Sequence, residues 1–290
     1  MDIRLLGPVE IRDGLDRPVP LARAGQRCVL AALALQPGRL IGTDALIRYL
    51  WGDKPPAKAG DTLASYTRAV RNALITAGAD TDVLNRRLGG YELHVPPEQV
   101  DYHRFAALVR DAAREPSPAV SVEIYKTAAS LWRGDPLAGL STDWAADTAQ
   151  RLTREYLHAS CLRLRRQLES GAHAEAAAGV AALLTETVPT DEIIMIGMEA
   201  LAHAGRHAEI DRFVANATSR MWDLVEARPG EAVRARAAQL IADPPAAPRP
   251  PHESSDPREE RGGQAQLTAI NCGTVFIAGG DQIISFLRHR

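Results

Sequence analysis

The sequence has few of the residues that cross-link a protein or carry it into a membrane. Its 290 residues include only three cysteines, which are far apart, at Cys28, Cys161 and Cys272. This spacing argues against a disulfide framework and fits a reducing compartment. No uninterrupted apolar run is long enough to span a bilayer, and no signal-like segment opens the chain. We therefore expect a soluble cytoplasmic protein, with Cys28 and Cys161 as small core residues.

Motifs that indicate catalysis are also missing. The sequence contains no phosphate-binding loop of the nucleotide-hydrolase type, no nucleophile elbow and no glycine-rich dinucleotide motif. His203 and His207 are four residues apart on an expected helix, but no third metal ligand accompanies them. Carboxylate pairs such as Asp143 and Asp147 are common on helix surfaces. We expect no enzymatic activity, no metal and no cofactor.

Charge and composition divide the chain into four segments. Residues 1–96 carry 13 Lys and Arg against 10 Asp and Glu, a net charge of +3, whereas residues 97–242 carry 16 against 20, a net charge of −4. Residues 243–263 are rich in proline and charge, which predicts an extended linker. Residues 264–290 have strand propensity interrupted by small and polar residues, and we assign them no function.

The most informative segment is residues 26–74, whose pattern predicts three helices. In the third, apolar residues recur at helical spacing, at Leu63, Tyr66, Val70 and Leu74. Polar side chains project from the opposite side, namely Ser65, Arg68 and Asn72, with Arg71 on the flank. Such a face suits the major groove of DNA, although an ordinary solvated helix has the same pattern. We expect Tyr66 and Trp51 to be packed in the core.

Short strands are expected on both sides of these helices. Residues 3–7, 9–11 and 18–21 are punctuated by glycine and proline and predict an N-terminal sheet. Residues 83–95 predict a hairpin whose turn region holds Arg86 and Arg87 followed by paired glycines. A basic hairpin directly after a recognition helix can contact the adjacent DNA backbone or minor groove.

This order of elements resembles the winged-helix DNA-binding domain of response regulators and, more narrowly, the Streptomyces antibiotic regulatory protein family. The residues that carry the resemblance are Gln26-Arg27, Pro37-Gly38-Arg39, Leu50-Trp51-Gly52, Pro55-Pro56, Thr62-Leu63 through Arg71, Ala73-Leu74 and Gly89-Gly90-Tyr91. One position departs from the family pattern: the Arg-Leu-Arg run of the recognition helix is Ala69-Val70-Arg71 here. This departure suggests a changed operator preference.

Residues from about Asp101 to Ala242 form a nearly continuous helical pattern that resembles the bacterial transcriptional activation domain of that family. Within it, Gly171-Ala172-His173-Ala174-Glu175 is repeated as Gly205-Arg206-His207-Ala208-Glu209, about one tetratricopeptide period later. The family's Ala-Leu after the second glutamate is Ile210-Asp211 here, so we expect the last hairpin to pack differently. The expected fold is therefore mixed, an α+β winged helix (1–96, OmpR-type) followed by an all-α tetratricopeptide-like domain (97–242).

The resemblance implies a pathway-specific activator of antibiotic biosynthesis that binds direct repeats near the −35 element and recruits RNA polymerase through its sigma factor. Two protomers are expected side by side on double-stranded DNA. The residues expected to contact DNA are Thr62, Ser65, Arg68, Arg71 and Asn72 on the third helix, Arg86 and Arg87 on the wing, and Lys54 and Lys58 for backbone or polymerase contacts.

Two other interpretations remain open. In the first, the helical domain senses a metabolite and the protein is a repressor or co-regulator. In the second, the protein is a tetratricopeptide-like interaction scaffold that no longer binds DNA, which the Ala69 departure and the small positive charge make conceivable. The helical domain itself offers grooves for a peptide, a protein or a small molecule, or a surface for dimerisation.

Overall fold

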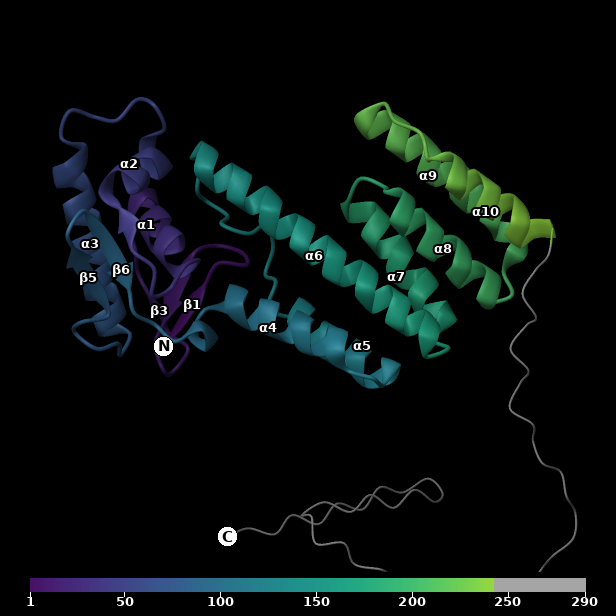
Figure 1. Cartoon of the computed structure of the whole chain (residues 1–290), viewed down its shortest axis with the longest axis horizontal. Coiled ribbons are helices and arrows are strands. Elements are labelled where there is room, and N and C mark those ends of the chain that lie inside the picture. The colour runs from purple at the N-terminus through teal and green to yellow at the C-terminus, as the bar shows by residue number, and fades with distance from the viewer. Residues whose placement is uncertain (243–290) are drawn as a thin grey trace, which may run out of the picture. The chain divides into compact units, whose positions relative to one another are not determined.

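The structure is a computed structural model, and it describes residues 1–242 (Figure 1). The expected linker (243–263), tail (264–290) and Cys272 lie outside the described residues. The chain begins with an antiparallel sheet of three short strands, β1 (Asp2–Arg4), β2 (Glu10–Arg12) and β3 (Pro18–Val19), in the order β1-β2-β3. Ile3 and Ile11 face each other across β1 and β2 and are both fully buried, so this N-terminal sheet is present as predicted.

Three helices and a second sheet follow. The helices are α1 (Ala24–Ala34), α2 (Thr43–Trp51) and α3 (Ala59–Thr76). The predicted hairpin is formed by β5 (Leu84–Arg87) and β6 (Gly90–Leu93). A two-residue strand that the sequence analysis did not predict, β4 (Ile41–Gly42), pairs with β6 and completes a sheet of order β4-β6-β5.

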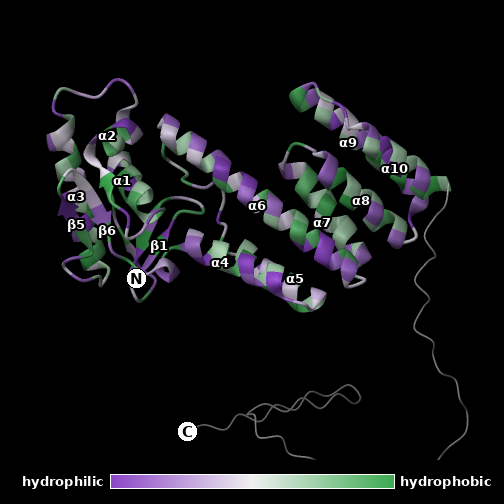
Figure 2. Ribbon diagram, viewed as in Figure 1, coloured by the Kyte–Doolittle hydropathy of each residue, from purple (hydrophilic) through white to green (hydrophobic). Residues whose placement is uncertain are grey.

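The rest of the described chain is helical. A short 3-10 helix, η1 (Pro97–Gln99), leads into the long helices, which consecutively pack on one another: α4 (Asp101–Arg114), α5 (Pro118–Ala129), α6 (Asp143–Glu169), α7 (His173–Glu186), α8 (Asp191–His203), α9 (Ile210–Val225) and α10 (Glu231–Ala242). A second 3-10 helix, η2 (His207–Glu209), precedes α9. Both hydrophobic and hydrophilic residues occur along these helices, as Figure 2 shows, and their apolar sides form the core between them.

Threonine side chains mark where two of these helices begin. The Thr142 hydroxyl accepts a hydrogen bond from the Ala145 N–H at 3.2 Å and caps α6, and the Thr190 hydroxyl accepts one from the Ile193 N–H at 3.4 Å and caps α8. Each satisfies one of the N–H groups that a helix start leaves unbonded. Ile210-Asp211 replaces the Ala-Leu pair of the family, and Ile210 is fully buried in the core that joins α8, α9 and α10.

One hydrophobic core extends across the boundary that we expected near residue 96. Buried side chains from the N-terminal sheet and from α1 to α3 join those of α4, α5 and α6 in a single cluster. The rings of Tyr49 on α2 and Trp144 on α6 stack with their centroids 4.9 Å apart. Cys28 and Cys161 are both buried, as predicted, and burial raises the pKa of each thiol to about 11. The separation into domains at residue 96 stays a prediction.

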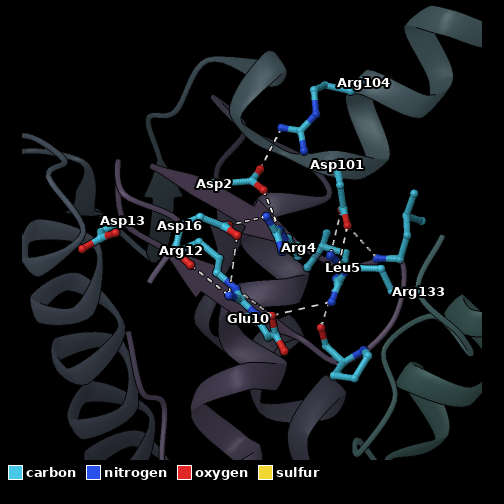
Figure 3. A network of polar contacts seen from close by, with 12 residues as sticks. Asp2, Arg4, Leu5, Glu10, Arg12, Asp13, Asp16, Asp101, Arg104 and Arg133 are labelled. Atoms are coloured by element: carbon cyan, nitrogen blue, oxygen red, sulfur yellow. Dashed lines mark hydrogen bonds and ion pairs between the residues drawn. The ribbon is translucent and has the colours of Figure 1, made fainter. Parts of the chain in front are cut away.

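A buried carboxylate joins the N-terminal sheet to α4. Asp101 is 1% exposed, and its two oxygens accept hydrogen bonds from the Leu5 N–H at 2.7 Å and the Leu6 N–H at 3.0 Å (Figure 3). The Arg133 guanidinium lies 3.5 Å from the same carboxylate. The backbone strengthens the junction, because the Arg133 N–H donates to Leu6 O and the Leu137 N–H donates to Leu5 O. Desolvation raises the pKa of Asp101, and the two backbone donors and Arg133 oppose this shift.

Replacing this carboxylate should destabilise the whole described region. Asp101→Asn presents one acceptor oxygen and one competing donor to the two backbone N–H groups, and it removes the charge next to Arg133. We expect the free energy of unfolding to fall by about 2–4 kcal/mol. Urea unfolding of the full chain, followed by tryptophan fluorescence, measures the loss. Asp111→Asn, at an exposed carboxylate of the same helix, is the control and should change stability by less than about 0.5 kcal/mol. Equal stabilities of the two variants would contradict this role of Asp101.

Candidate nucleic-acid interface

Helix α3 has two faces of opposite character. Leu63, Val70 and Leu74 are fully buried, which confirms the predicted apolar stripe. The side chains predicted to project outward are exposed, namely Ser65, Arg68 and Asn72. They lie three and four residues apart in turn, so they follow one side of the helix. Short polar groups with one guanidinium between them give this side both hydrogen-bonding capacity and positive charge.

Aromatic packing holds α3 against the first two helices. Tyr66 and Trp51 are half-buried, pack against the main core and stack with their ring centroids 6.4 Å apart, so the prediction that both are packed is confirmed. Gly25 of α1 lies directly beneath the Tyr66 ring, since a Cβ added at Gly25 would collide with it. A larger residue at position 25 would therefore displace the Tyr66 ring from its place between α1 and α3.

Arg71 connects α3 to the hairpin. Its Nε donates a hydrogen bond to Leu84 O at 2.8 Å, and the side chain is half-buried. The sequence predicts only a DNA contact for Arg71, because a bond to a carbonyl 13 residues away has no sequence signal. The bond uses one of several N–H donors of the guanidinium, so this side chain can brace the hairpin and still present donors to a phosphate.

The β5–β6 hairpin places its arginines at the surface. Arg86 and Arg87 are both exposed, and Arg87 Nε lies 3.6 Å from a carboxylate oxygen of Glu92 on β6. The turn is fixed from below: Gly89 O accepts a hydrogen bond from the Thr43 N–H at 2.8 Å, and a Cβ added at Gly90 would collide with the backbone of Ile41. The hairpin is therefore held at its turn as well as along its strands.

The loop between α2 and α3 carries the two predicted lysines. Lys54 and Lys58 are exposed, and Lys58 directly precedes α3. Helix α3 begins at Ala59, and the Thr62 N–H is bonded to Lys58 O at 3.0 Å, so the backbone of Thr62 has no free N–H to offer a phosphate. Thr62 is half-buried, and its hydroxyl is the group that stays available for a phosphate.

A groove of about 400 Å³ lies between α7, α8 and α9. Small and apolar residues line it together with charged ones, among them Ala177, Ala181, Gly197, Arg206, Arg212 and Phe213. Both arginines are paired with Glu209, which lies 2.7 Å from Arg206 and 3.4 Å from Arg212.

The histidines of the helical region do not gather as a metal site. His203 stacks on His173 with ring centroids 5.0 Å apart, and burial, followed by the charge of His203, lowers the pKa of His173. Residues 1–242 contain no group of three or more histidine, cysteine or acidic side chains arranged to hold a metal ion. Across the same residues, none of the helices combines the length and the apolar character needed to span a bilayer.

The chain is similar to known bacterial regulatory proteins. Residues 100–241 match the model of the bacterial transcriptional activator domain. Regulatory protein DnrI of Streptomyces peucetius is 30% identical over 219 residues, which cover 72% of this chain and 80% of DnrI. The chain belongs to the Streptomyces antibiotic regulatory protein family. Transcriptional regulator RedD of Streptomyces coelicolor is 30% identical over 260 residues, which cover 84% of this chain and 71% of RedD. The family consists of transcriptional regulators that act on DNA and the transcription machinery.

A solved structure supports the fold of this family member. Mycobacterium tuberculosis EmbR, in complex with a low-affinity phosphopeptide, matches with a TM-score of 0.77 and 27% identity, over 84% of this chain and 66% of the EmbR chain. The likeness extends through most of the described region, which is mostly helical with a small N-terminal β region. At the departure from the family pattern, Ala69 is half-buried on α3 beside the exposed Arg68.

Two glycines in this region should respond to alanine in opposite directions. Gly90→Ala should lower the free energy of unfolding by about 1–3 kcal/mol, because the added Cβ collides with the Ile41 backbone and forces β4 and β6 apart. Gly60→Ala should raise it by about 0.5–1 kcal/mol, because Gly60 lies in α3 with open space around it. Thermal unfolding of the full chain compares the two. A neutral Gly90→Ala would show that the turn is not closely seated on β4.

Proposed function

We propose that this regulator is a cytoplasmic, sequence-specific DNA-binding activator in which residues 1–96 form a winged helix and α3 is its recognition helix. The observation that carries the proposal is the exposed row of Ser65, Arg68 and Asn72 on a helix that Arg71 joins to a hairpin with two exposed arginines, Arg86 and Arg87. A helix of this kind fits the major groove, where side-chain donors and acceptors distinguish the base pairs. The hairpin is then the wing.

Each predicted residue has a role that follows from its exposure. Arg68, at the centre of the exposed row, is proposed to contact a base edge or a phosphate, and Ser65 and Asn72 supply neighbouring hydrogen bonds. Arg71 braces the wing and presents its remaining donors to the backbone. The wing arginines, the Thr62 hydroxyl and the two loop lysines are proposed to contact the DNA backbone, and Lys54 and Lys58 alternatively to contact polymerase.

Two protomers on direct repeats would compensate for a weakly basic interface. Residues 1–96 carry a net charge of only +3, and Ala69 lacks the guanidinium that the family pattern has at that position. Non-specific affinity depends mainly on neutralised phosphates, so one protomer is expected to bind weakly. Side-by-side protomers keep both recognition helices on one face of the DNA if the repeats are spaced by about 10–11 base pairs.

The proposed outcome of binding is recruitment of RNA polymerase. The regulatory relatives of this chain, together with its match to the activator domain, support activation of a secondary-metabolite gene cluster by contacts with the sigma factor and other polymerase subunits. Residues 97–242 are proposed to act as a tetratricopeptide-like domain that supplies such contacts or joins protomers. Run-off transcription with purified polymerase tests whether the protein activates or represses, because an activator raises the amount of transcript and a repressor lowers it.

Arg68→Ala should weaken specific DNA binding by about 10–100-fold, the range expected for loss of one arginine contact to a base. The test selects a duplex from a randomised pool with the wild-type full chain, then measures the affinities of the variants for that duplex at several salt concentrations. Arg212→Ala, at an arginine of the helical region with a side chain that is 76% exposed, is the matched control. Equal losses in both variants would contradict recognition by α3. Failure of the wild-type chain to retain any duplex at low salt would favour the interaction scaffold.

A further inference from the structure

The tip of the wing carries an apolar side chain that contributes nothing to the fold. Leu88 lies between Arg87 and Gly89 and is fully exposed, at 101% of its reference area. It is the most exposed large apolar side chain within residues 1–242, followed by Leu15 at 74%. An exposed side chain of this size gains no burial energy in the folded protein.

The turn itself does not call for leucine. Arg87 pairs with Gly90 across the hairpin, so Leu88 and Gly89 form a two-residue turn. Such turns favour Gly, Asn or Asp where the backbone needs a positive φ. Gly89 supplies the positive φ, at +83°. Leu88 is not among the residues with positive φ, so the turn accepts leucine at this position without requiring it, and the exposed side chain has no packing gain either.

The surroundings of Leu88 fix its position relative to the recognition helix. Below the turn, Gly89 O is bonded to the Thr43 N–H of α2, and Gly90 is packed on the Ile41 backbone. At the far end of β5, Arg71 bonds to Leu84 O and ties the strand to α3. The tip is thus part of a braced element, so inserting it into a partner costs less conformational entropy than ordering a free loop.

We infer that Leu88 is an apolar wedge that enters the minor groove of DNA next to the major groove occupied by α3. Minor-groove proteins insert leucine and similar side chains against the bases, and arginines beside the insertion are attracted by the groove's negative potential. Arg86 and Arg87 directly precede Leu88 and are exposed, which gives the tip the required charge. The inference rests on the proposed function, since it needs the wing to be on DNA.

Substitution of Leu88 tests the wedge without disturbing the fold, because the side chain has no contacts to lose. The duplex is the one that the wild-type full chain selects from a randomised pool. Leu88→Ala and Leu88→Asn should bind it about tenfold more weakly, the scale of losing one buried leucine side chain. Neither should change the dependence of affinity on salt, because no phosphate contact is lost, whereas Arg87→Ala should reduce the salt slope by about one. Leu15→Ala, at the other exposed hairpin leucine, should bind as wild type.

Footprinting locates the contact. Hydroxyl radicals attack the sugars from the minor groove, so Leu88→Ala should lose protection over one short minor-groove stretch. Protection of guanine N7 from methylation reports the major groove and should persist, because N7 lies in that groove and α3 is unchanged. Thermal unfolding should be the same for wild type and both Leu88 variants.

The outcomes separate this inference from the proposed function. If the wild type binds its selected duplex and the Leu88 variants bind equally well, the wedge is refuted while DNA binding stands. Equal binding with reduced run-off transcription also refutes it and assigns Leu88 to a protein contact with polymerase. If the wild-type chain retains no duplex at all, the proposed function fails and the wedge with it.

Discussion

The position of the N-terminal sheet depends on the burial of one carboxylate. A charged group with only 1% of its surface exposed costs several kcal/mol unless hydrogen bonds and a counter-charge replace its water. Asp101 meets this requirement only where the N–H groups of Leu5 and Leu6 and the Arg133 guanidinium converge. Sliding or tilting the sheet on α4 would leave the carboxylate buried and unpaired. The contact therefore selects a single arrangement, and the apolar core around it supplies most of the stabilisation.

Further contacts join the helical region to the helices that support the candidate interface. His103, two residues after Asp101, places Nε2 3.0 Å from Ala34 O at the end of α1, and the Tyr49–Trp144 stack joins α2 to α6. Helix α3 is in turn packed on α1 and α2. A surface on α4 to α6 is thus held at a defined position relative to α3. If α3 binds DNA as proposed, a partner bound to α4 to α6 would have a defined position relative to the DNA.

The parts of this fold that the sequence predicts are those with local causes. The helical spacing of Leu63, Val70 and Leu74 predicts both α3 and its exposed side, and paired glycines predict the β5–β6 turn. The parts that it misses depend on distant partners. Strand β4 is two residues long and exists only through pairing with β6, and Asp101 bonds to backbone groups 95 and 96 residues away. The start of α3 also has no local signal, because Lys58 makes no side-chain cap there.

The departure at Ala69 affects how much positive charge α3 presents. An alanine between Arg68 and Val70 removes one positive charge from a helix whose exposed row has a single arginine. The neighbouring Arg71 is also engaged with Leu84 O, so part of its donor capacity is directed to the wing. In the proposed mode of DNA binding, α3 alone would supply less of the interaction energy and the wing would supply more. Bracing of the hairpin by Arg71, Thr43 and Ile41 is consistent with that shift, since a contact far from the helix contributes specificity only if its position is fixed.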